Sequence, residues 1–271
     1  MAFANTPYRF LLFMMVLFIG ISVADVATRV APEPLAPVVS TLAFFGFYGL
    51  MILSVKVLLW TEDGGPLVRL GLDIDNRTLP LLAVGGLGGI LSAGYVYVVA
   101  LFLGGSVKLI AEVSSDMVIS QGIITALVAL VEEICYRGYL MTRLAESFGR
   151  PAGVIISSAF FSLMHYSWWF GNDTVTPELV AMFSLNLFVG GMVLGLSYYA
   201  TGRVLWTAVG FHYFWNMMAY TLFPVFPRDS VASPILFQIE WGMTTIPAFL
   251  LGLLVMVGLL RISDLAESSG R

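Results

Sequence analysis

Two adjacent carboxylates and a guanidinium, Glu132, Glu133 and Arg137, lie within a run of residues that is otherwise apolar. Insertion of an ionisable side chain near the centre of a bilayer costs roughly 2.5–3.5 kcal/mol, so three within one short stretch indicate a functional site. On an α-helix, Glu133 and Arg137 would stand one above the other, whereas Glu132 would point away from them. We therefore predict a supporting Glu133–Arg137 ion pair and a free Glu132 that can act as a general base.

Two histidines and an asparagine accompany these charges. His165 and His212 are the only histidines of the chain, and both lie in apolar runs. His212 and Asn216 are spaced so that they share one face of a helix, and their side chains could converge on a single oxygen atom. Polar residues are so rare in the apolar runs that we predict one catalytic site made of Glu132, His165, His212 and Asn216.

These residue types suit the hydrolysis of an amide. A free glutamate beside a histidine can hold and deprotonate water, since both groups titrate near neutrality once they are buried and interact. A second histidine with an amide donor can stabilise the oxyanion that forms when this water attacks a carbonyl group. Together these are the parts of a hydrolase that forms no covalent intermediate.

The sequence allows two other mechanisms, one with the same residues and a metal ion and one with Cys135. Glu132, His165 and His212 could bind Zn²⁺ and leave one coordination position for water. We favour the mechanism without a metal, because the sequence has no HExxH motif and asparagine is a poor zinc ligand. Cys135 could act as a nucleophile with a histidine, but the neighbouring carboxylates disfavour its thiolate, so we interpret it as a packing residue.

The composition is that of a polytopic membrane protein. Of 271 residues, 59% are hydrophobic and 11% are charged, whereas a water-soluble domain carries about twice that share of charge. A helix needs about 20 residues to cross the bilayer, so this length allows about seven to nine spans and no separate soluble catalytic domain. We therefore predict a single transmembrane domain over residues 1–271, with a motif-bearing core at about 117–223. The net charge of −4 does not indicate a charged partner such as nucleic acid.

The apolar runs predict an all-α protein in which about eight transmembrane helices enclose the active site. The runs cover approximately residues 10–24, 38–60, 79–103, 117–144, 151–170, 177–201, 203–223 and 241–260. Within the third run, Gly85 and Gly89 form a pair of small residues that allows two helix backbones to approach closely.

Eight spans place both termini on the same side of the membrane, and the basic residues indicate which side. The side of the termini would carry Arg9, Lys56, Arg69, Arg77, Arg143, Arg150, Arg203, Arg261 and Arg271, and the opposite side Arg29, Lys108 and Arg228. The excess of positive charge predicts that both termini are cytoplasmic, as in a multi-pass protein of a bacterial-type cytoplasmic membrane.

Three short motifs in this core resemble those of a known family. The sequence reads EEICYRG at Glu132–Gly138, FSLMH at Phe161–His165 and HYFWN at His212–Asn216. These segments resemble the EExxxR, FxxxH and HxxxN motifs of the CAAX protease and bacteriocin-processing (CPBP, or Abi) family, which includes the type II CAAX prenyl endopeptidases. The motifs occur in the family's order, and every motif position is filled.

The resemblance implies an intramembrane endopeptidase with eight helices. By position in the motifs, Glu132 would be the water-activating base assisted by His165, and His212 and Asn216 would form the oxyanion hole. The second glutamate and the arginine of the first motif would have supporting roles. Both a glutamate-dependent and a zinc-dependent mechanism are attributed to the family. The resemblance implies a membrane-associated peptide or protein as the substrate but does not identify it.

Two alternatives to a protease are a membrane scaffold or immunity protein and a proton-coupled transporter. In a transporter, the glutamates and histidines would form a proton relay. Transporters of this kind are built from inverted repeats with broken helices in matching halves, and the sequence shows neither feature. The sequence does not indicate an oligomeric state.

Overall fold

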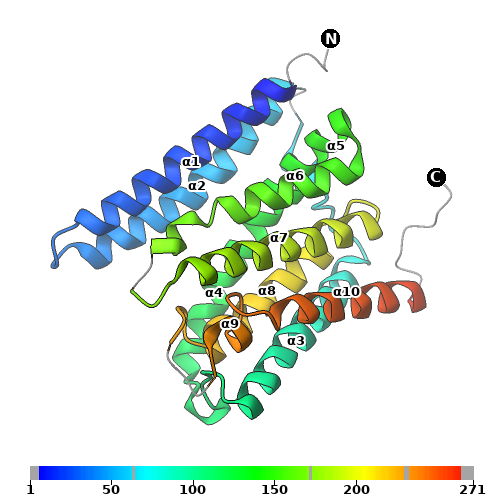
Figure 1. Ribbon diagram of the computed structural model, residues 1–271. Helices are drawn as coiled ribbons and strands as arrows, with labels where there is room; N and C mark the ends of the chain where they lie inside the picture. The colour runs from blue at the N-terminus through cyan, green and yellow to red at the C-terminus, as the bar shows by residue number, and fades with distance from the viewer. Residues whose placement is uncertain (1–5, 63–64, 171–172, 229–231, 264–271) are drawn as a thin grey trace.

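The computed structural model describes residues 6–62, 65–170, 173–228 and 232–263. These residues form helices joined by short connections, without any β-strand among them, as the composition predicts. The α-helices, shown in Figure 1, are α1 (Thr6–Val30), α2 (Ala36–Glu62), α3 (Thr78–Leu103), α4 (Ser115–Glu132), α5 (Thr142–Phe148), α6 (Arg150–Leu163), α7 (Pro177–Ala200), α8 (Trp206–Leu222), α9 (Pro234–Phe237) and α10 (Thr245–Ile262). A π-helical segment, Glu133–Met141, joins α4 to α5.

Six helical stretches of the described chain are long and apolar enough to cross a membrane. They are Tyr8–Val30, Ala36–Glu62, Thr78–Leu103, Ser115–Phe148, Pro177–Ala200 and Thr245–Ile262. The chain is thus an integral, multi-pass membrane protein. The two other predicted spans correspond to α6, which has 14 residues, and α8, which has 17. At 1.5 Å per residue α6 is only about 21 Å long, shorter than the bilayer core of about 30 Å.

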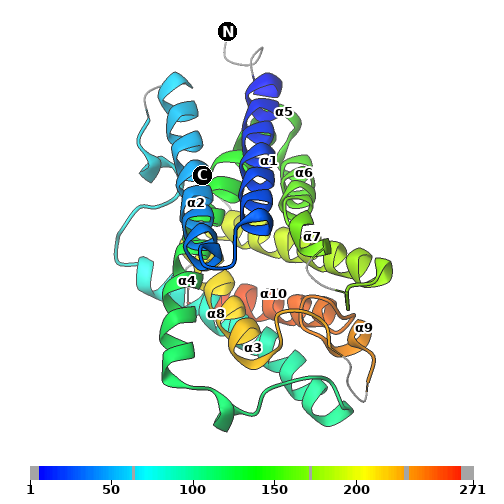
Figure 2. The same cartoon turned by 90° about the vertical axis from the view of Figure 1, so that its left-hand side faces the viewer.

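The helices form two packed groups that meet at the π-helical segment and α8. Helices α1 and α2 stand side by side as an antiparallel hairpin on one flank (Figures 1 and 2). A large apolar cluster joins this hairpin to the chain between α4 and α6. Another apolar cluster joins α3, α7, α8 and α10. The motif residues therefore lie where the two groups come together.

Helices α3 and α8 make the closest of these contacts. A Cβ atom on Gly85 would collide with the backbone of Thr207, and one on Gly89 would lie 2.5 Å from the carbonyl oxygen of Phe211. The predicted role of these two glycines in close helix packing is thus confirmed. Since α8 carries His212 and Asn216, the glycines of α3 help to set the position of the site.

Replacement of Gly85 by alanine should destabilise the protein by about 1–3 kcal/mol, because the added methyl group strikes backbone and cannot be relieved by a side-chain rotation. Thermal unfolding of the purified protein in detergent would measure the effect. Gly94→Ala on the same helix is the control, because its Cβ would meet only the Met218 side chain, at 3.9 Å. Equal unfolding midpoints for the two variants would contradict this account of the packing.

The π-helical segment is the part of the fold that the sequence pattern did not reveal. The apolar run at 117–144 predicts one helix, but the nine residues Glu133–Met141 within it are π-helical. All nine residues are buried. The stretch therefore has no alternation of buried and exposed positions from which the helical period could be predicted. π-helical turns are rare and are often found at functional sites.

Candidate active site

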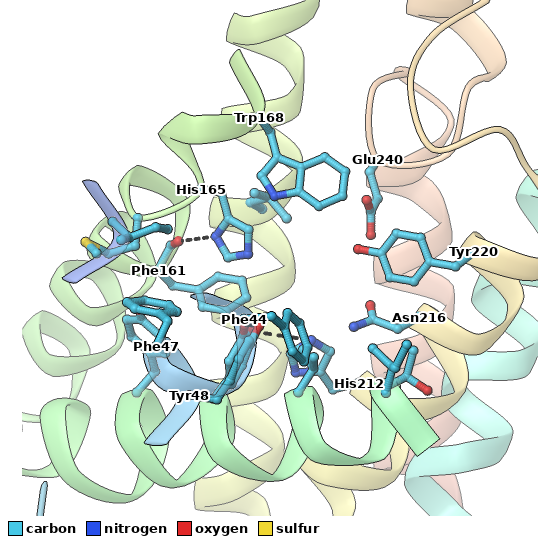
Figure 3. Close-up of a pocket in the computed structure, with 18 of the residues that line it drawn as sticks. Phe44, Phe47, Tyr48, Phe161, His165, Trp168, His212, Asn216, Tyr220 and Glu240 are labelled. Carbon is cyan, nitrogen blue, oxygen red and sulfur yellow. Dashed lines mark hydrogen bonds and ion pairs between the residues drawn. The ribbon is translucent and has the colours of Figure 1, made fainter. Parts of the chain in front are cut away.

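Residues from all three motifs line one cavity of about 370 Å³ (Figure 3). All four predicted catalytic residues contribute to its wall. Its polar side chains are Tyr48, Gln121, Thr125, Glu132, Tyr136, His165, His212, Asn216, Tyr220 and Glu240. The remaining wall is mainly aromatic and aliphatic, and it comes from helices α1, α2, α4, α6, α7 and α8 and their connections.

Glu133 lies behind this wall and holds two partners. Arg137 Nη1 is 2.9 Å from Glu133 Oε1, and both side chains are completely buried. The ion pair predicted from the spacing is therefore present. His212 Nδ1 lies 2.8 Å from the same oxygen, a contact between two helices that sequence spacing could not indicate. A carboxylate only accepts hydrogen bonds, so Nδ1 of His212 donates and its Nε2 is left to face the site.

The Arg137 guanidinium has further partners that fix it in the protein interior. Its carbon atom lies 4.3 Å from the centre of the Phe161 ring, a distance typical of a cation–π contact. Nη2 donates to the carbonyl oxygen of Gly191 at 3.4 Å. These contacts compensate part of the cost of burying the charge, and they tie the first motif to α6 and α7.

Glu132 points away from the Arg137 pair, as the helical geometry predicts. It is not entirely free, because the Tyr48 hydroxyl of α2 donates to Oε1 at 2.9 Å. Oε2 is buried and has no hydrogen-bond partner in the described part of the chain, and His212 Nε2 lies 3.8 Å from it. A buried carboxylate oxygen without a partner is costly, so this atom is a place for a water molecule or a substrate group.

His165 lies just beyond the end of α6. A hydrogen bond to the backbone determines which of its ring nitrogens carries the hydrogen. Its Nδ1 is 2.7 Å from the carbonyl oxygen of Phe161. A carbonyl only accepts, so Nδ1 carries the hydrogen and the neutral ring keeps its lone pair on Nε2. In Figure 3 this second nitrogen lies on the cavity side of the ring. His165 can therefore accept a proton from a group in the cavity.

His212 and Asn216 are one turn apart on α8, and both are buried at the cavity wall. The prediction that they share a helix face is confirmed. Figure 3 shows the amide of Asn216 turned into the cavity beside His212. An asparagine amide supplies two N–H donors, so this wall can offer hydrogen bonds to an oxygen that gains negative charge.

Among the polar residues of the cavity that sequence reasoning missed, Tyr48 hydrogen-bonds Glu132 and Glu240 adds a second carboxyl group to the wall. Tyr48 lies within an ordinary apolar helix, where no sequence signal marks it. Glu240 lies between α9 and α10, and its Oε1 accepts a hydrogen bond from Trp215 Nε1 at 3.1 Å. Burial raises the pKa of the Glu240 carboxyl group, although the Trp215 hydrogen bond opposes this effect. The sequence did carry one signal for Glu240: it is a single acidic residue between apolar neighbours, directly before the apolar run at 241–260.

The zinc alternative concerns Glu132, His165 and His212, which line the same cavity. Within the described ranges, no three His, Cys, Asp or Glu side chains are grouped so that they could hold a metal ion. Cys135 is completely buried and does not line the cavity.

The cavity extends from Glu132 towards the end of the bundle that lies opposite the termini. Its outer wall includes Ile124 in the middle of α4, Trp168 beyond α6 and Val225 beyond α8. Ile124 and Val225 are exposed, whereas Glu132 is buried. Figure 1 shows the α1–α2 turn and α9 at this end, away from the chain ends. The exposed part of the cavity wall therefore lies towards this end.

Comparison with known proteins supports the reading of the motifs. Residues 115–218 match the family model described as type II CAAX prenyl endopeptidase Rce1-like. The matched segment runs from the start of α4 into α8 and contains all three motifs, whereas Tyr48 and Glu240 lie outside it. A search of curated proteins gave no match to the chain. The resemblance inferred from the motifs is confirmed.

Proposed function

We propose that this chain, a member of the CAAX protease and bacteriocin-processing family, is an intramembrane endopeptidase that cleaves a membrane-associated peptide or protein. The observation that carries the proposal is the state of the two glutamates. One oxygen of Glu133 is held by Arg137 and His212, and its other oxygen, which also has no partner in the described part of the chain, lies outside the cavity lining. Glu132 instead places its buried, unpartnered oxygen at the cavity that His165 and Asn216 also line.

Glu132 acts as the general base in this proposal. A water molecule held by Oε2 gives its proton to this carboxylate as its oxygen attacks the substrate carbonyl carbon. The lone pair on His165 Nε2 assists by accepting a hydrogen bond from the same water. When the carbon–nitrogen bond breaks, the proton on Glu132 passes to the leaving amine, and the carboxylate is restored.

His212 and Asn216 act on the other reacting atom. The carbonyl oxygen of the substrate becomes negatively charged when water attacks, and donors placed at this oxygen lower the barrier. The Asn216 amide and His212 Nε2 are the groups of α8 that face the cavity for this purpose. Because Nδ1 of His212 donates to Glu133, Nε2 is a donor in the imidazolium form of the ring, in which both nitrogens carry a hydrogen. Glu133 fixes the orientation of the His212 ring, and Arg137 neutralises Glu133, so both residues support the site without contacting the substrate.

Cleavage should be detectable and should not depend on a metal ion. The purified protein would be reconstituted in liposomes with a library of membrane-anchored peptides, and mass spectrometry would identify new peptide termini. We expect cleavage to persist after exhaustive chelation, with no stoichiometric zinc found by elemental analysis, because Glu132 and His165 can hold and deprotonate water without a metal ion. Loss of activity on chelation and its return with added Zn²⁺ would contradict the metal-free mechanism. Failure to cleave any peptide would favour a scaffold or a transporter.

We also propose that both termini are cytoplasmic in a bacterial-type cytoplasmic membrane, which places the cavity opening on the outer side. The only native cysteine, Cys135, is buried, so single cysteines can be introduced and labelled. An impermeant maleimide should label Val225→Cys in intact cells, because that residue is exposed near the opening. Ile74 is exposed on the side of the bundle where the termini lie, so Ile74→Cys should react only after permeabilisation. The opposite pattern would reverse the orientation.

A further inference from the structure

The outer part of the cavity contains a group of side chains that the proposed chemistry does not use. We call Trp168, Phe183, Tyr220 and Glu240 the acid–aromatic subsite. The rings of Trp168 and Tyr220 are nearly parallel, with an interplanar angle of 24° and centroids 6.3 Å apart. Phe183 lies against Trp168, with ring centroids 6.2 Å apart. Figure 3 shows Glu240 beside Tyr220, across the cavity from His165 and Trp168.

The carboxylate of this subsite is held in a fixed place. Glu240 has a backbone φ of 64°, in the left-handed region that residues other than glycine seldom adopt. Its N–H donates to Thr245 Oγ1 at 3.0 Å, and its carbonyl oxygen accepts from Asn186 Nδ2 at 2.7 Å. With Trp215 bound to Oε1, the backbone and one carboxylate oxygen are fixed, while the residue is only 7% exposed.

The charges at the cavity indicate what can bind there. Its wall contains two glutamates, Glu132 and Glu240, and no lysine or arginine among the described lining residues. Arg137 lies behind the wall and is paired with Glu133. An anionic group would thus meet acids without a compensating cation, whereas a cationic group would gain both a carboxylate and aromatic faces.

We propose that the acid–aromatic subsite binds a lysine or arginine side chain of the substrate. The aliphatic stem of that side chain packs against Trp168, Phe183 and Tyr220, and its charged end pairs with Glu240. A bound cation favours the ionised form of the carboxyl group and so opposes the effect of burial. This inference rests on the proposed function, because it places a basic residue of the substrate beside the bond that the water activated by Glu132 attacks.

Peptide binding tests the subsite separately from catalysis. In the Glu132→Gln background, the binding of a palmitoylated hexapeptide with one central lysine would be compared with that of the same peptide carrying norleucine instead. We expect the lysine peptide to bind about tenfold more tightly, as for a buried hydrogen bond between charged groups. Glu240→Gln should remove most of this preference. Glu112→Gln is the control, since it removes an exposed acid just before α4, on the same side of the membrane, and should leave the preference unchanged.

The outcomes distinguish this inference from the proposed function. A lysine preference that depends on Glu240, in a protein that cleaves no peptide, would support the subsite and contradict the protease. Cleavage by the unmodified protein without any lysine preference would overturn the subsite alone, and so would equal effects of Glu240→Gln and Glu112→Gln. If Glu240→Gln does not fold, Trp168→Leu must lower the ratio of lysine to norleucine affinity, and an unchanged ratio would overturn the proposal.

Discussion

Replacement of Glu132 by glutamine is expected to lower the rate of peptide cleavage by about 10²–10⁴-fold, the usual contribution of a general base. The amide has nearly the same shape as the carboxylate and can still accept the hydrogen bond from Tyr48. It cannot accept a proton from water. Initial rates in liposomes would measure the loss, and circular dichroism with thermal unfolding would show that the fold is retained.

Glu146→Gln provides the control for this experiment. Glu146 lies on α5 away from the cavity, and its side chain is 49% exposed. Its replacement should leave the cleavage rate unchanged. If Glu132→Gln cleaved as fast as Glu146→Gln, Glu132 could not be the base, and the assignment of the two motif glutamates would have to be revised.

Replacement of Arg137 by methionine should lower the free energy of unfolding by about 3–5 kcal/mol, because it leaves a buried carboxylate without its cation. Glu133 and Arg137 are both fully buried, so water cannot take the place of the missing partner. The double variant Glu133→Gln with Arg137→Met should recover part of the loss, since it removes the charge that the single variant leaves unpaired. Reversible unfolding in mixed micelles would measure these differences.

Arg143→Gln is the matched control for the buried ion pair. Arg143 pairs with Glu62 at 2.7 Å and with Glu146 at 2.9 Å, but its side chain is 23% exposed. Partly exposed pairs contribute about 0–1 kcal/mol, so this variant should unfold close to the unmodified protein. If Arg137→Met and Arg143→Gln lowered the free energy of unfolding equally, the buried ion pair would contribute no more to stability than the partly exposed one.

The sequence predicted those parts of the site that depend on one helix. The Glu133–Arg137 pair, the different direction of Glu132 and the shared face of His212 and Asn216 all follow from helical periodicity. The all-helical membrane fold follows from composition and from the length of the apolar runs. These features are local, so the amino-acid order was sufficient to define them.

Contacts between distant segments could not be predicted in this way. Tyr48 reaches Glu132 only because α2 packs beside α4, and Glu240 reaches the cavity only through the connection from α9 to α10. The bond from His212 to Glu133 likewise depends on the approach of α8 to the π-helical segment. The length of α6 was also overestimated, because the apolar residues after Leu163 continue in a turn and a 3₁₀ segment.

Helix α3 shows how a helix without any motif residue can govern the chemistry. Its glycines lie against the backbone of α8, and α8 carries the histidine that must stay within reach of both glutamates. A side chain at these positions would push the backbones of α3 and α8 apart, and it would thereby displace His212 without contacting it. In a complete mutational scan, Gly85 and Gly89 should therefore be as intolerant of substitution as the residues of the motifs. One wall of this site is positioned by residues that have no side chain.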